Sequence, residues 1–573
     1  MCGIFGYKGE EQASKLIHRG LKKLEYRGYD SSGIAVVSNP SVKLEKKEGR
    51  VEELNPEFKG KTGIGHTRWA THGGVNDKNA HPHTDEEEKI AVVHNGIIEN
   101  HEELREEIGE HKFKSSTDTE VIPHLLKKHI KKEEGLKEAV EKAVEKLEGA
   151  YAFAAVLETG EMIVYRKESP LVIGLGDNEF FVASDVNPFL EHTREAVFLQ
   201  DKEFAIIEDE ELKLYREGER VEPEVQEIEW DAEEASKAGH NHFMEKEILE
   251  QSETVKRAVF QDKSDVEKSV EMVKEADKVF LTACGTASFA ADLGAKYLRE
   301  AGIEAYSEQS HEFEYMADQV SEDDLVIAVS QSGETADLLS ALKKVDAPVL
   351  SAVNVVGSTL ARNSSHNMYV NAGPEIGVAS TKAFTAQLTV LKLLALTMQK
   401  DLESARNSLL KTSNKIDPML EKNKEKINEI AEYITEKDDI YFIGRNKGCE
   451  LAKEASLKLK ELSYIHSEAF PGGEFKHGTL SLIEEGVPVF AFLIDDESAT
   501  LSNAIEAGSR GADLIGIGTE KRDNFKHFIE VPEDENSEIL EIIPFQLLAY
   551  ETSKLKGNNP DKPRNLAKSI TVK

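Results

Sequence analysis

The second residue of the chain is a cysteine, and its position favours nucleophilic chemistry. The small residue after Met1 favours removal of the initiator methionine, which would leave Cys2 with the free α-amino group of the chain. An α-amine has an ordinary pKa of about 7.7–8.0, so it can serve as the base for the neighbouring thiol without a histidine. The simpler interpretation is a small buried residue. The β-like run that begins at Gly3 would fix the thiol at a strand end and favours the nucleophile.

Three other segments of the first half carry groups that suit an amide substrate. Arg68 precedes Trp69 in GIGHTRWATHGG (63–74), and a guanidinium forms a natural fork for an amino-acid carboxylate. Asn95 and Gly96 end a strand-like run, where an amide and a backbone N–H can stabilise an oxyanion. Asp118 opens a predicted helix and either caps it or binds an ammonium group. A salt bridge at Arg68 and a turn at Asn95 are the structural alternatives.

Histidines are frequent between residues 66 and 94, which raises the hypothesis of a metal site. The candidates are His72, His81, His83 and His94. They lack the H-x₃-H or C-x₂-C spacing of zinc sites, so we predict no metal. Acid–base and imine chemistry would suffice for the reaction considered below, and no organic cofactor is predicted either.

The second half has a candidate phosphate site in SQSGET (330–335), which follows an apolar run and opens a predicted helix. Hydroxyls and backbone N–H groups at a helix start can hold a phosphate, although a plain Ser/Gly turn is the alternative. The predicted contacts are Ser330, Gln331, Ser332 and Thr335. Thr286 in GTAS (285–288), with Ser380 and Lys382 in VASTK (378–382), would add hydroxyls and a cation at neighbouring strand ends.

Four side chains near the carboxyl end could move protons or form an imine. Lys458 and Glu461 are three residues apart, so they share a helix face as a surface ion pair or as an acid–base pair. His477 lies in the glycine-rich GGEFKHG (472–478) and is a candidate proton shuttle. Lys568, in PRNLAKS (563–569), is either a solvated lysine or an imine-forming amine.

The arrangement of predicted elements gives the scaffold for these groups. Strands and helices cluster separately in the first 220 residues, with antiparallel strands expected around 151–209, which is typical of an α+β domain. From about residue 270, apolar strands alternate with helices in a parallel, doubly wound pattern. A weak repeat of about 160 residues relates 277–285 to 438–446 and 325–339 to 487–501. At the place of SQSGET the second copy reads IDDES, whose carboxylates would repel phosphate.

Composition limits the classes of function. The 573 residues carry a formal net charge of −36, which disfavours nucleic acids and anionic membranes as partners. Three cysteines do not make a disulfide framework, the first residues do not read as a signal peptide, and the longest apolar stretch (388–398) is too short for a bilayer. We expect a cytoplasmic protein.

Combined, the segments CGIFG, LEYRGYDSSG, HTRWATHG, HNGIIENH and TDTE resemble the glutaminase domain of the N-terminal-nucleophile amidotransferases. The resemblance implies an αββα sandwich in which Cys2 is both nucleophile and base and forms a thioester. It implies that Asn95 and Gly96 stabilise the oxyanion, that Arg27 supports the cysteine and that Trp69 gates the ammonia passage. The residues implied to surround glutamine are Arg68, Trp69, Thr71, His72, Asn95, Gly96 and Asp118.

The second half resembles the sugar-isomerase half of the glutamine:fructose-6-phosphate aminotransferase family. The matching segments, in order, are ACGT, SQSGETAD, EIGVASTKAFTAQL, LKLKELSYIHSEAF, KHG and PRNLAKS. The resemblance implies two doubly wound α/β sugar-isomerase (SIS) subdomains with parallel sheets. It assigns proton transfer between C2 and C1 to Glu461 and ring opening to His477 of the neighbouring subunit in a homodimer. It also assigns the imine to Lys568, and proton transfer near the ring oxygen to Lys458.

The resemblance predicts the reaction and its partners, glutamine and fructose 6-phosphate, with internal transfer of ammonia past Trp69 to give glucosamine 6-phosphate and glutamate. The predicted domains are 2–218 for the glutaminase, 219–250 for a linker, 251–400 and 401–557 for the SIS subdomains, and 558–573 for an active-site tail. Two departures from the family are Ala287, where a serine is usual and Ser288 follows, and Thr479, where proline is usual.

Two alternatives remain from the sequence. Another amidotransferase, such as an amidophosphoribosyltransferase, would share the glutaminase half, but SQSGET argues against its second half. A non-catalytic sugar-phosphate sensor would keep SQSGET without needing Lys458, Glu461, His477 and Lys568 together. Glutamate release and amino-sugar formation distinguish the three.

Overall fold

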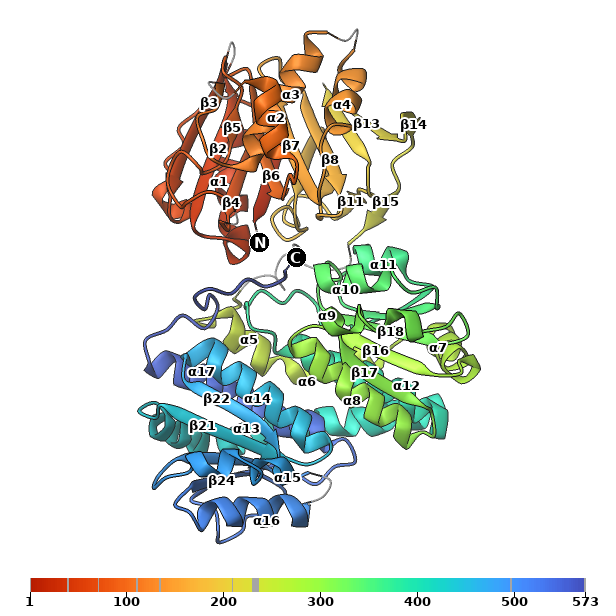
Figure 1. Ribbon diagram of the computed structural model, residues 1–573, viewed down its shortest axis with the longest axis vertical. Helices are drawn as coiled ribbons and strands as arrows, with labels where there is room; N and C mark the ends of the chain where they lie inside the picture. Colours follow the sequence, from red (N-terminus) through yellow and green to blue (C-terminus); the bar gives the residue numbers. More distant parts are fainter. Residues whose placement is uncertain are drawn as a thin grey trace. The chain divides into compact units, whose positions relative to one another are not determined.

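The chain folds into two compact units, which we describe separately. The computed structural model describes residues 2–38, 41–70, 72–109, 112–132, 135–208, 210–228, 237–494 and 497–570 (Figure 1). The first unit is built from residues up to 235, and the second from 236–356 and 360–568.

The first unit contains an antiparallel sheet in the order β15-β11-β9-β10-β1-β4-β2-β3. In chain order its strands are β1 (Gly3–Lys8), β2 (Ser31–Ser38), β3 (Ser41–Glu48), β4 (Thr62–Arg68), β9 (Val172–Gly176), β10 (Glu179–Ala183), β11 (Glu195–Phe198) and β15 (Val225–Glu227). The strand β1 pairs with β4 and β10, so Cys2 directly precedes a central strand. Helix α1 (Ala13–Leu24) packs against β1 and β4 through its apolar stripe.

A second sheet of the same unit has the order β14-β13-β12-β8-β7-β6-β5. Its strands are β5 (His83–Thr84), β6 (Ile90–Gly96), β7 (Tyr151–Leu157), β8 (Met162–Lys167), β12 (Phe204–Glu208), β13 (Glu211–Arg216) and β14 (Glu219–Val221). The antiparallel pairing of β7 with β8 and of β8 with β12 confirms the arrangement expected around 151–209. The central strands β6, β7 and β8 are buried along nearly their whole length because both faces are covered, whereas β13 and β14 at one edge are polar and largely exposed.

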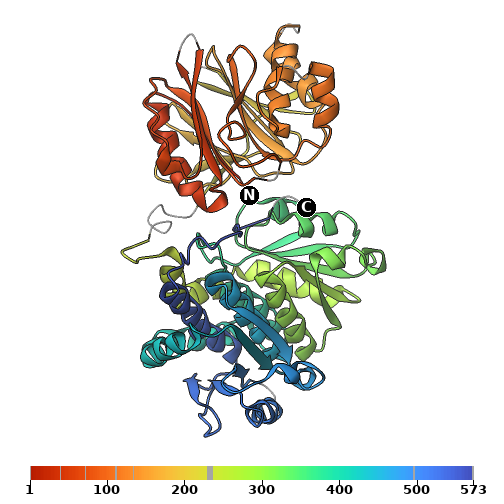
Figure 2. The same ribbon diagram turned by 60° about the vertical axis from the view of Figure 1, so that its left-hand side comes forward.

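The two sheets enclose one core and the helices cover the outside, which makes an αββα sandwich. Ile4 and Ile64 of the first sheet meet Val93 and Val156 of the second in this inner layer. On the outer face of the second sheet, Leu125 packs with residues of α2 (His101–Ile108), α3 (Val121–Ile130) and α4 (Leu136–Val144). Figure 2 shows these layers from another side.

The first unit extends beyond residue 218, where the sequence suggested that a linker begins. The strands β14 and β15 lie within that predicted linker, and each adds an edge strand to a sheet of the first unit. The reason is backbone pairing: the charged segment has no apolar face, but it satisfies the hydrogen bonds of β13 and β11. Residues 229–236 lie outside the described part of the chain.

The second unit holds two parallel five-stranded sheets with the same topology. The orders are β17-β16-β18-β19-β20 and β22-β21-β23-β24-β25, so each sheet has the doubly wound order 2-1-3-4-5. The first contains β16 (Val279–Ala283), β17 (Ala305–Gln309), β18 (Leu325–Ser330), β19 (Val349–Val353) and β20 (His366–Tyr369). The second contains β21 (Asp439–Gly444), β22 (His466–Pro471), β23 (Pro488–Phe492), β24 (Asp513–Gly518) and β25 (His527–Glu530). The match of β16 to β21 and of β18 to β23 confirms the predicted repeat.

Helices surround both sheets and join them into one core. The helices of the first half are α5 (Phe243–Leu249), α6 (Gln251–Val259), α7 (Lys263–Glu275), α8 (Thr286–Glu300), α9 (Ser310–Phe313), α10 (Ala336–Leu342), α11 (Thr359–Asn363) and α12 (Lys382–Gln399). Those of the second half are α13 (Leu402–Ile434), α14 (Lys447–Ser463), α15 (Gly472–Phe475), α16 (Glu497–Gly508) and α17 (Ser537–Leu555). Side chains from α8, α12, α13, α14 and α17 share a single apolar cluster with both sheets.

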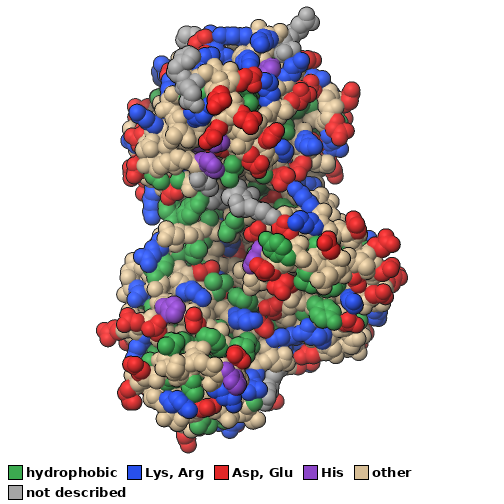
Figure 3. Space-filling model, viewed as in Figure 1, with side chains coloured by type: hydrophobic (Ala, Val, Ile, Leu, Met, Phe, Trp, Pro, Cys, Tyr) green, Lys and Arg blue, Asp and Glu red, His purple; other side chains and the backbone are tan. Residues whose placement is uncertain are grey.

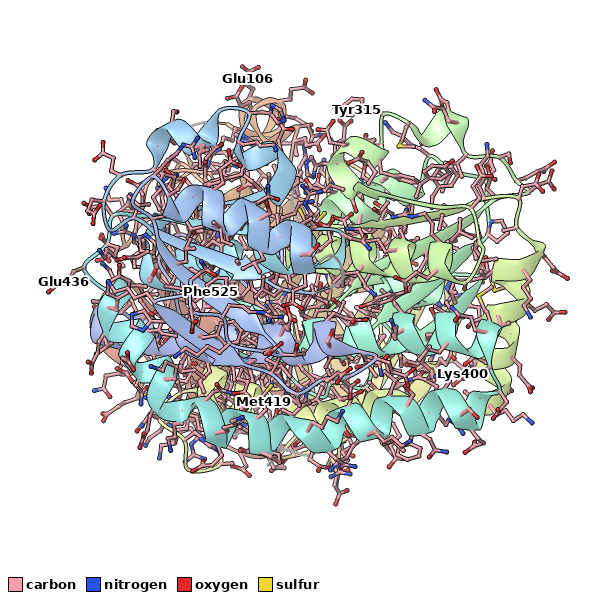
Figure 4. The ribbon with its side chains drawn as sticks, turned by 90° about the horizontal axis from the view of Figure 1, so that it is seen from below. Glu106, Tyr315, Lys400, Met419, Glu436 and Phe525 are labelled. Carbon is pink, nitrogen blue, oxygen red and sulfur yellow. The ribbon has the colours of Figure 1, made fainter. Side chains whose placement is uncertain are left out.

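Helix α13 links the two halves of the second unit. Figure 4 shows it running along one face from near Lys400 to near Glu436, with the buried Met419 between them. Over this length it packs against α6, α12 and α17. A helix of this length therefore acts as a shared support for the apolar cluster common to both repeats, and each repeat also has a smaller apolar cluster of its own.

Charged side chains of both signs cover the face shown in Figure 3, with acidic ones in excess over the whole chain. Among the described residues, no helix combines the length and apolarity needed to cross a membrane.

Candidate functional site

Cys2 lies in front of β1, where three neighbouring segments contact it. The backbone N–H of Trp69 donates to its Sγ at 3.2 Å, and Arg27 Nε donates to its carbonyl oxygen at 3.2 Å. Burial raises the pKa of the thiol, while the amino terminus, the Trp69 N–H, Arg68 and Arg27 act in the opposite direction. The site thus surrounds Cys2 with donors and positive charge that favour the thiolate when a base removes its proton.

Arg68 and Trp69 continue from β4 into the loop that faces Cys2. The Arg68 guanidinium is buried and donates to the backbone carbonyls of His72, Gly73 and Gly74. The structure therefore shows Arg68 holding a loop rather than the simple salt bridge considered as its alternative. Its Coulomb interactions with Asp118 and Asp30 oppose the lowering of its pKa by burial.

The Trp69 ring rests edge-on against Tyr29, with ring centroids 5.7 Å apart and an interplanar angle of 88°. The next residue, Ala70, donates its N–H to Asp30 Oδ2 at 2.9 Å. Both contacts tie the end of β4 to the segment before β2. Thr71, predicted to contact glutamine, lies outside the described residues.

Asn95 and Gly96 end β6 beside Cys2, as the sequence suggested. Asn95 Nδ2 donates to the Cys2 carbonyl at 3.2 Å and to Ser184 Oγ at 2.8 Å. Gly96 has φ +108°, and a Cβ there would lie 2.1 Å from the carbonyl oxygen of Ala150. Only glycine fits this close approach to the neighbouring strand.

Asp118 is buried and accepts the backbone N–H of Ile98 at 2.8 Å. Asp118 thus braces the loop that follows Gly96 and does not cap its own helix. Of the two roles considered from the sequence, the helix cap is therefore wrong. The Coulomb interaction of Arg68 with Asp118 brings a cation and an anion to the same side of the site. This pair matches the two charges of a free amino acid.

The histidines gather behind this site, although their arrangement is not that of a metal centre. The rings of His66 and His81 stack at 4.2 Å, and His83 and His94 contact His81 at 4.8 and 6.3 Å. Burial holds the pKa of each of the four below its ordinary value, to about 3 for His66. The ring of His72 contacts that of His101. In the described part of the chain, no group of three or more His, Cys, Asp or Glu side chains is placed to hold a metal ion.

In the second unit, the predicted phosphate contacts follow β16 and β18. These strands are neighbours in the sheet, and their connections leave in opposite directions, which is where doubly wound sheets bind ligands. Ser330 Oγ accepts the N–H of Gly333 at 2.9 Å, and Ser332 Oγ accepts that of Glu334 at 3.1 Å. The hydroxyl-rich turn 330–335 therefore ends at Thr335, directly before α10.

Thr286 begins α8 at the end of β16 and is largely buried. Two residues on, Ser288 donates its hydroxyl to the carbonyl of Gly285 at 2.7 Å. This bond turns the Ser288 hydroxyl back to its own helix start.

Ser380 and Lys382 are both engaged by carboxylates. Ser380 Oγ donates to Glu375 at 3.0 Å, and Lys382 pairs with Glu250. Lys568 reaches the same loop from the carboxyl-terminal tail, where it pairs with Glu375 and donates to the carbonyl of Gly377 at 2.8 Å. The structure thus brings Ser380 and Lys568 together around one buried acid.

Lys458 and Glu461 form a pair on α14, but the lysine is not on the surface. The Lys458 side chain is 1% exposed and contacts Glu461 as well as Glu454, at 3.7 Å. Burial lowers the pKa of Lys458, but the two glutamates outweigh it and raise the pKa above its ordinary value. The surface ion pair considered from the sequence is therefore wrong, because the packing of α14 within the second unit buries the Lys458 side chain.

His477 differs from the other predicted groups because it is exposed, on the turn after α15. Its backbone N–H donates to the carbonyl of Glu474 at 2.8 Å, which keeps the turn tight. The matching turn of the first repeat carries Tyr315, which is 83% exposed and lies at the edge of the view in Figure 4. The repeat thus places an exposed side chain at the same point of each half.

Sequence reasoning missed three buried acids. Glu454 is fully buried, and burial raises its pKa to about 8 against the opposing charge of Lys458. Glu375 accepts the N–H groups of Thr381 and Ala383; burial raises its pKa, but Lys568 and these N–H groups lower it below the ordinary value. Burial and Glu375 raise the pKa of Glu247 to about 7. The i, i+4, i+7 spacing of 454, 458 and 461 is the one signal that could have revealed Glu454.

Electrostatic interactions join these groups into one site. Glu375 acts on Lys458, and Thr286 interacts with Glu454. The end of β16, the loop before α12, helix α14 and the tail therefore converge within the second unit. An amine, a buried acid and an acid–base pair next to a hydroxyl-rich turn suit proton transfer on a small phosphorylated carbonyl compound.

The fold and the two sites define a class of protein: an N-terminal-nucleophile glutaminase joined to a pair of sugar-isomerase domains. Comparisons with known proteins agree. Residues 66–191 match the family described as "Glutamine amidotransferase domain", and residues 272–397 and 433–553 match the family described as "SIS domain".

Two relatives that match over the full length have the same name. The chain is 44% identical to the glutamine–fructose-6-phosphate aminotransferase (isomerizing) of Thermococcus kodakarensis and 43% identical to that of Clostridium tetani, with all of each chain covered. A solved structure of the C-terminal domain of glucosamine-fructose-6-phosphate aminotransferase from Francisella tularensis matches 57% of this chain and all of its own, with 33% identity and a TM-score of 0.54. The chain belongs to the glutamine–fructose-6-phosphate aminotransferase (isomerizing) family.

Proposed function

We propose that this chain converts fructose 6-phosphate and glutamine into glucosamine 6-phosphate and glutamate, the first step of hexosamine synthesis. Family membership over the full length supports this, and so does the presence of both required sites. The observation that carries the sugar half is the convergence of Lys568, Glu375 and Lys458 in the second unit.

In the glutaminase step, the Cys2 thiolate attacks the amide carbon of glutamine. The α-amino group of Cys2, having taken the thiol proton, gives it to the departing nitrogen, so that ammonia leaves and a thioester remains. Water then hydrolyses the thioester to glutamate and the free thiol. Asn95 Nδ2 and the Gly96 N–H stabilise the oxyanion, and Arg68 and Asp118 attract the carboxylate and ammonium of glutamine. Arg27, Trp69, Thr71 and His72 complete the proposed glutamine site.

In the sugar step, the phosphate binds at Ser330, Gln331, Ser332 and Thr335, with Thr286 and Ser380 at the adjoining strand ends. His477 assists ring opening, and the amine of Lys568 condenses with the C2 carbonyl with loss of water. Ammonia then replaces the lysine at C2, and Glu461 moves a proton from C1 to C2. Because Lys382 is paired with Glu250, we assign it to holding the loop rather than to direct phosphate contact.

We further propose a cytoplasmic homodimer in which His477 serves the neighbouring subunit. The exposure of His477 supports this assignment, because a proton shuttle for its own site would be expected to face that site. We propose residues 251–400 and 401–557 as the two SIS subdomains and residues 558–573 as the active-site tail. Because β14 and β15 belong to the first unit, we place the start of the linker at about residue 229 instead of 219.

Incubation of the purified protein with fructose 6-phosphate, with and without glutamine, tests the function. We expect the wild type to form glutamate and amino sugar in equal amounts only when both substrates are present. The Cys2→Ala variant should form neither product from glutamine. Release of glutamate without any amino sugar would contradict the assignment. Glutamine use by Cys2→Ala would contradict the N-terminal nucleophile.

A further inference from the structure

The side-chain amide of Asn95 has partners at both ends: Nδ2 faces the Cys2 carbonyl and Ser184 Oγ, and Oδ1 faces His66. The chemistry of these partners fixes its orientation. A backbone carbonyl only accepts hydrogen bonds, so the atom that faces the Cys2 carbonyl at 3.2 Å must be the NH₂ group. The oxygen of the amide must then face His66, whose Nε2 lies 3.0 Å away. Since Asn95 Oδ1 only accepts, His66 Nε2 must carry the proton.

His66 is held so that it can play this role without becoming charged. It lies on β4, next to the strand that follows Cys2, and its side chain is fully buried. The ring of His81 stacks on it at 4.2 Å with an interplanar angle of 21°, which restricts rotation of the imidazole. Burial lowers the pKa of His66 to about 3, so the ring is neutral at working pH and offers Asn95 one N–H.

His81 is itself held in place by a neighbour of the glutamine site. Its Nε2 lies 3.2 Å from Thr119 Oγ1, and His94 Nδ1 lies 2.9 Å from the same hydroxyl. Thr119 follows Asp118, so the stack is anchored to the segment that carries a proposed substrate contact. A fixed chain of contacts therefore runs from Thr119 through His81 and His66 to Asn95.

We propose that His66 is a positioning residue of the oxyanion hole: its Nε2–H holds Oδ1 of the Asn95 amide and so keeps Nδ2 on the side of Cys2. The inference rests on the glutaminase function proposed above. Without His66, Asn95 Oδ1 is buried with no donor, which costs free energy in the present orientation. Only the Cys2 carbonyl and Ser184 then hold Nδ2 on their side, so the side chain leaves this orientation more often. Each such departure removes a donor from the oxyanion.

The test compares variants at residue 66 by the kinetics of glutamine hydrolysis. His66→Leu fills similar space without a donor, and His66→Asn has a donor that stops short of Asn95. Loss of one oxyanion donor costs about 100- to 1,000-fold in kcat, and an amide that still spends part of its time correctly oriented should lose less. We expect both variants to lose about 10- to 100-fold in kcat with little change in KM for glutamine.

His66→Gln is the matched variant, because its amide N–H can reach the place of Nε2, and we expect it to recover most of kcat. A second readout is the combination with Asn95→Ala. If His66 acts through Asn95, then His66→Leu adds no further loss in that background.

Alkylation of Cys2 by iodoacetamide and isomerisation of fructose 6-phosphate show whether each variant is folded, since neither step needs the oxyanion hole. The proposal is overturned if His66→Leu and His66→Asn keep the wild-type kcat, if His66→Gln loses as much as they do, or if the losses at 66 and 95 multiply. A wild-type protein that does not hydrolyse glutamine would instead overturn the proposed function itself.

Discussion

At the scale of single residues, the sugar site depends on acids whose protonation is set by burial. Lys458 contacts both Glu461 and the fully buried Glu454, and its pKa is raised. Glu461 is the more exposed of the two glutamates, at 18% against 0% for Glu454. Glu454 is closed off from solvent, which suits it to holding the lysine rather than to moving protons from C1.

Glu454 gives the second unit a stability that depends on pH. Its pKa is about 8 in the folded chain and 4.5 when unfolded. Because the folded state binds this proton more tightly, its contribution to the free energy of unfolding is complete below about pH 4.5. It is lost as pH rises to about 8, by up to about 1.4 kcal/mol per unit. Glu454→Gln stays neutral, so its unfolding temperature should fall less over this range than that of the wild type.

Scanning calorimetry of both proteins at several pH values between about 5 and 8 measures this difference. Glu461→Gln is the control, because it removes a carboxylate of the same helix that is partly exposed. Parallel curves for the wild type and Glu454→Gln would contradict the assigned protonation.

At the scale of elements, the strand β21 and the helix α14 approach so closely that a side chain cannot fit between them. A Cβ at Gly444 would lie 2.2 Å from the carbonyl oxygen of Gly448. Gly444→Ala must therefore shift the start of α14, which carries Lys458 and Glu461. A displacement of about 1 Å can cost about 100-fold in rate, so we expect isomerisation of fructose 6-phosphate to fall at least about 10-fold.

Glutamine hydrolysis by the same Gly444→Ala protein is the internal control, because Cys2 lies in the other unit. Both rates can be measured on one preparation. Unchanged isomerisation would show that α14 tolerates the shift, and a loss of both activities would indicate general unfolding.

Elements differ in how well the sequence predicts them, for physical reasons. The central parallel strands of the second unit, such as β16, β18, β21 and β23, are apolar and stand between helices, so they and their repeat are predictable, whereas the polar edge strands β17, β20 and β22 are not. The strand β3 is missed because it is an edge strand with the charged sequence SVKLEKKE, and it pairs only with β2. Helix α14 is predicted, but the burial of Lys458 is not, because it depends on the packing of α14 within the second unit.

The candidate site residues also differ in how well the sequence predicts them. Cys2, Asn95 and Lys568 are predictable because each stands in a distinctive segment. Glu375 lies in a loop with an ordinary composition, and only the fold shows that it accepts N–H groups from Thr381 and Ala383. His66 is hidden among several histidines, and its contact with Asn95 joins two strands of different sheets.

At the scale of the whole molecule, the proposed exchange of His477 between subunits makes a quantitative prediction. His477→Ala and Glu461→Gln should each be inactive alone. In a mixed dimer, one site combines an intact Glu461 with an intact His477 from the partner, and the other site has neither. Equal amounts that re-associate freely should therefore regain about a quarter of wild-type synthase activity, measured after unfolding and refolding the mixture.

Differently tagged chains show whether mixed dimers have formed. If they have formed and the activity stays at the level of the separate variants, His477 does not act in the site of the partner subunit. The control is a double variant that carries His477→Ala and Glu461→Gln in the same chain, mixed with wild type. Each mixed dimer then keeps one intact Glu461 and one intact His477, but the two never meet at the same site.

The central property of the whole molecule is that one chain takes nitrogen from glutamine and places it on the sugar. The most direct test uses glutamine labelled with ¹⁵N in the side-chain amide, fructose 6-phosphate and an excess of unlabelled ammonium. Mass spectrometry of the amino sugar then reports the source of its nitrogen. We predict that the product carries ¹⁵N at C2 in proportion to the glutamate released. An unlabelled amino sugar, or labelled ammonia without any amino sugar, would contradict the claim.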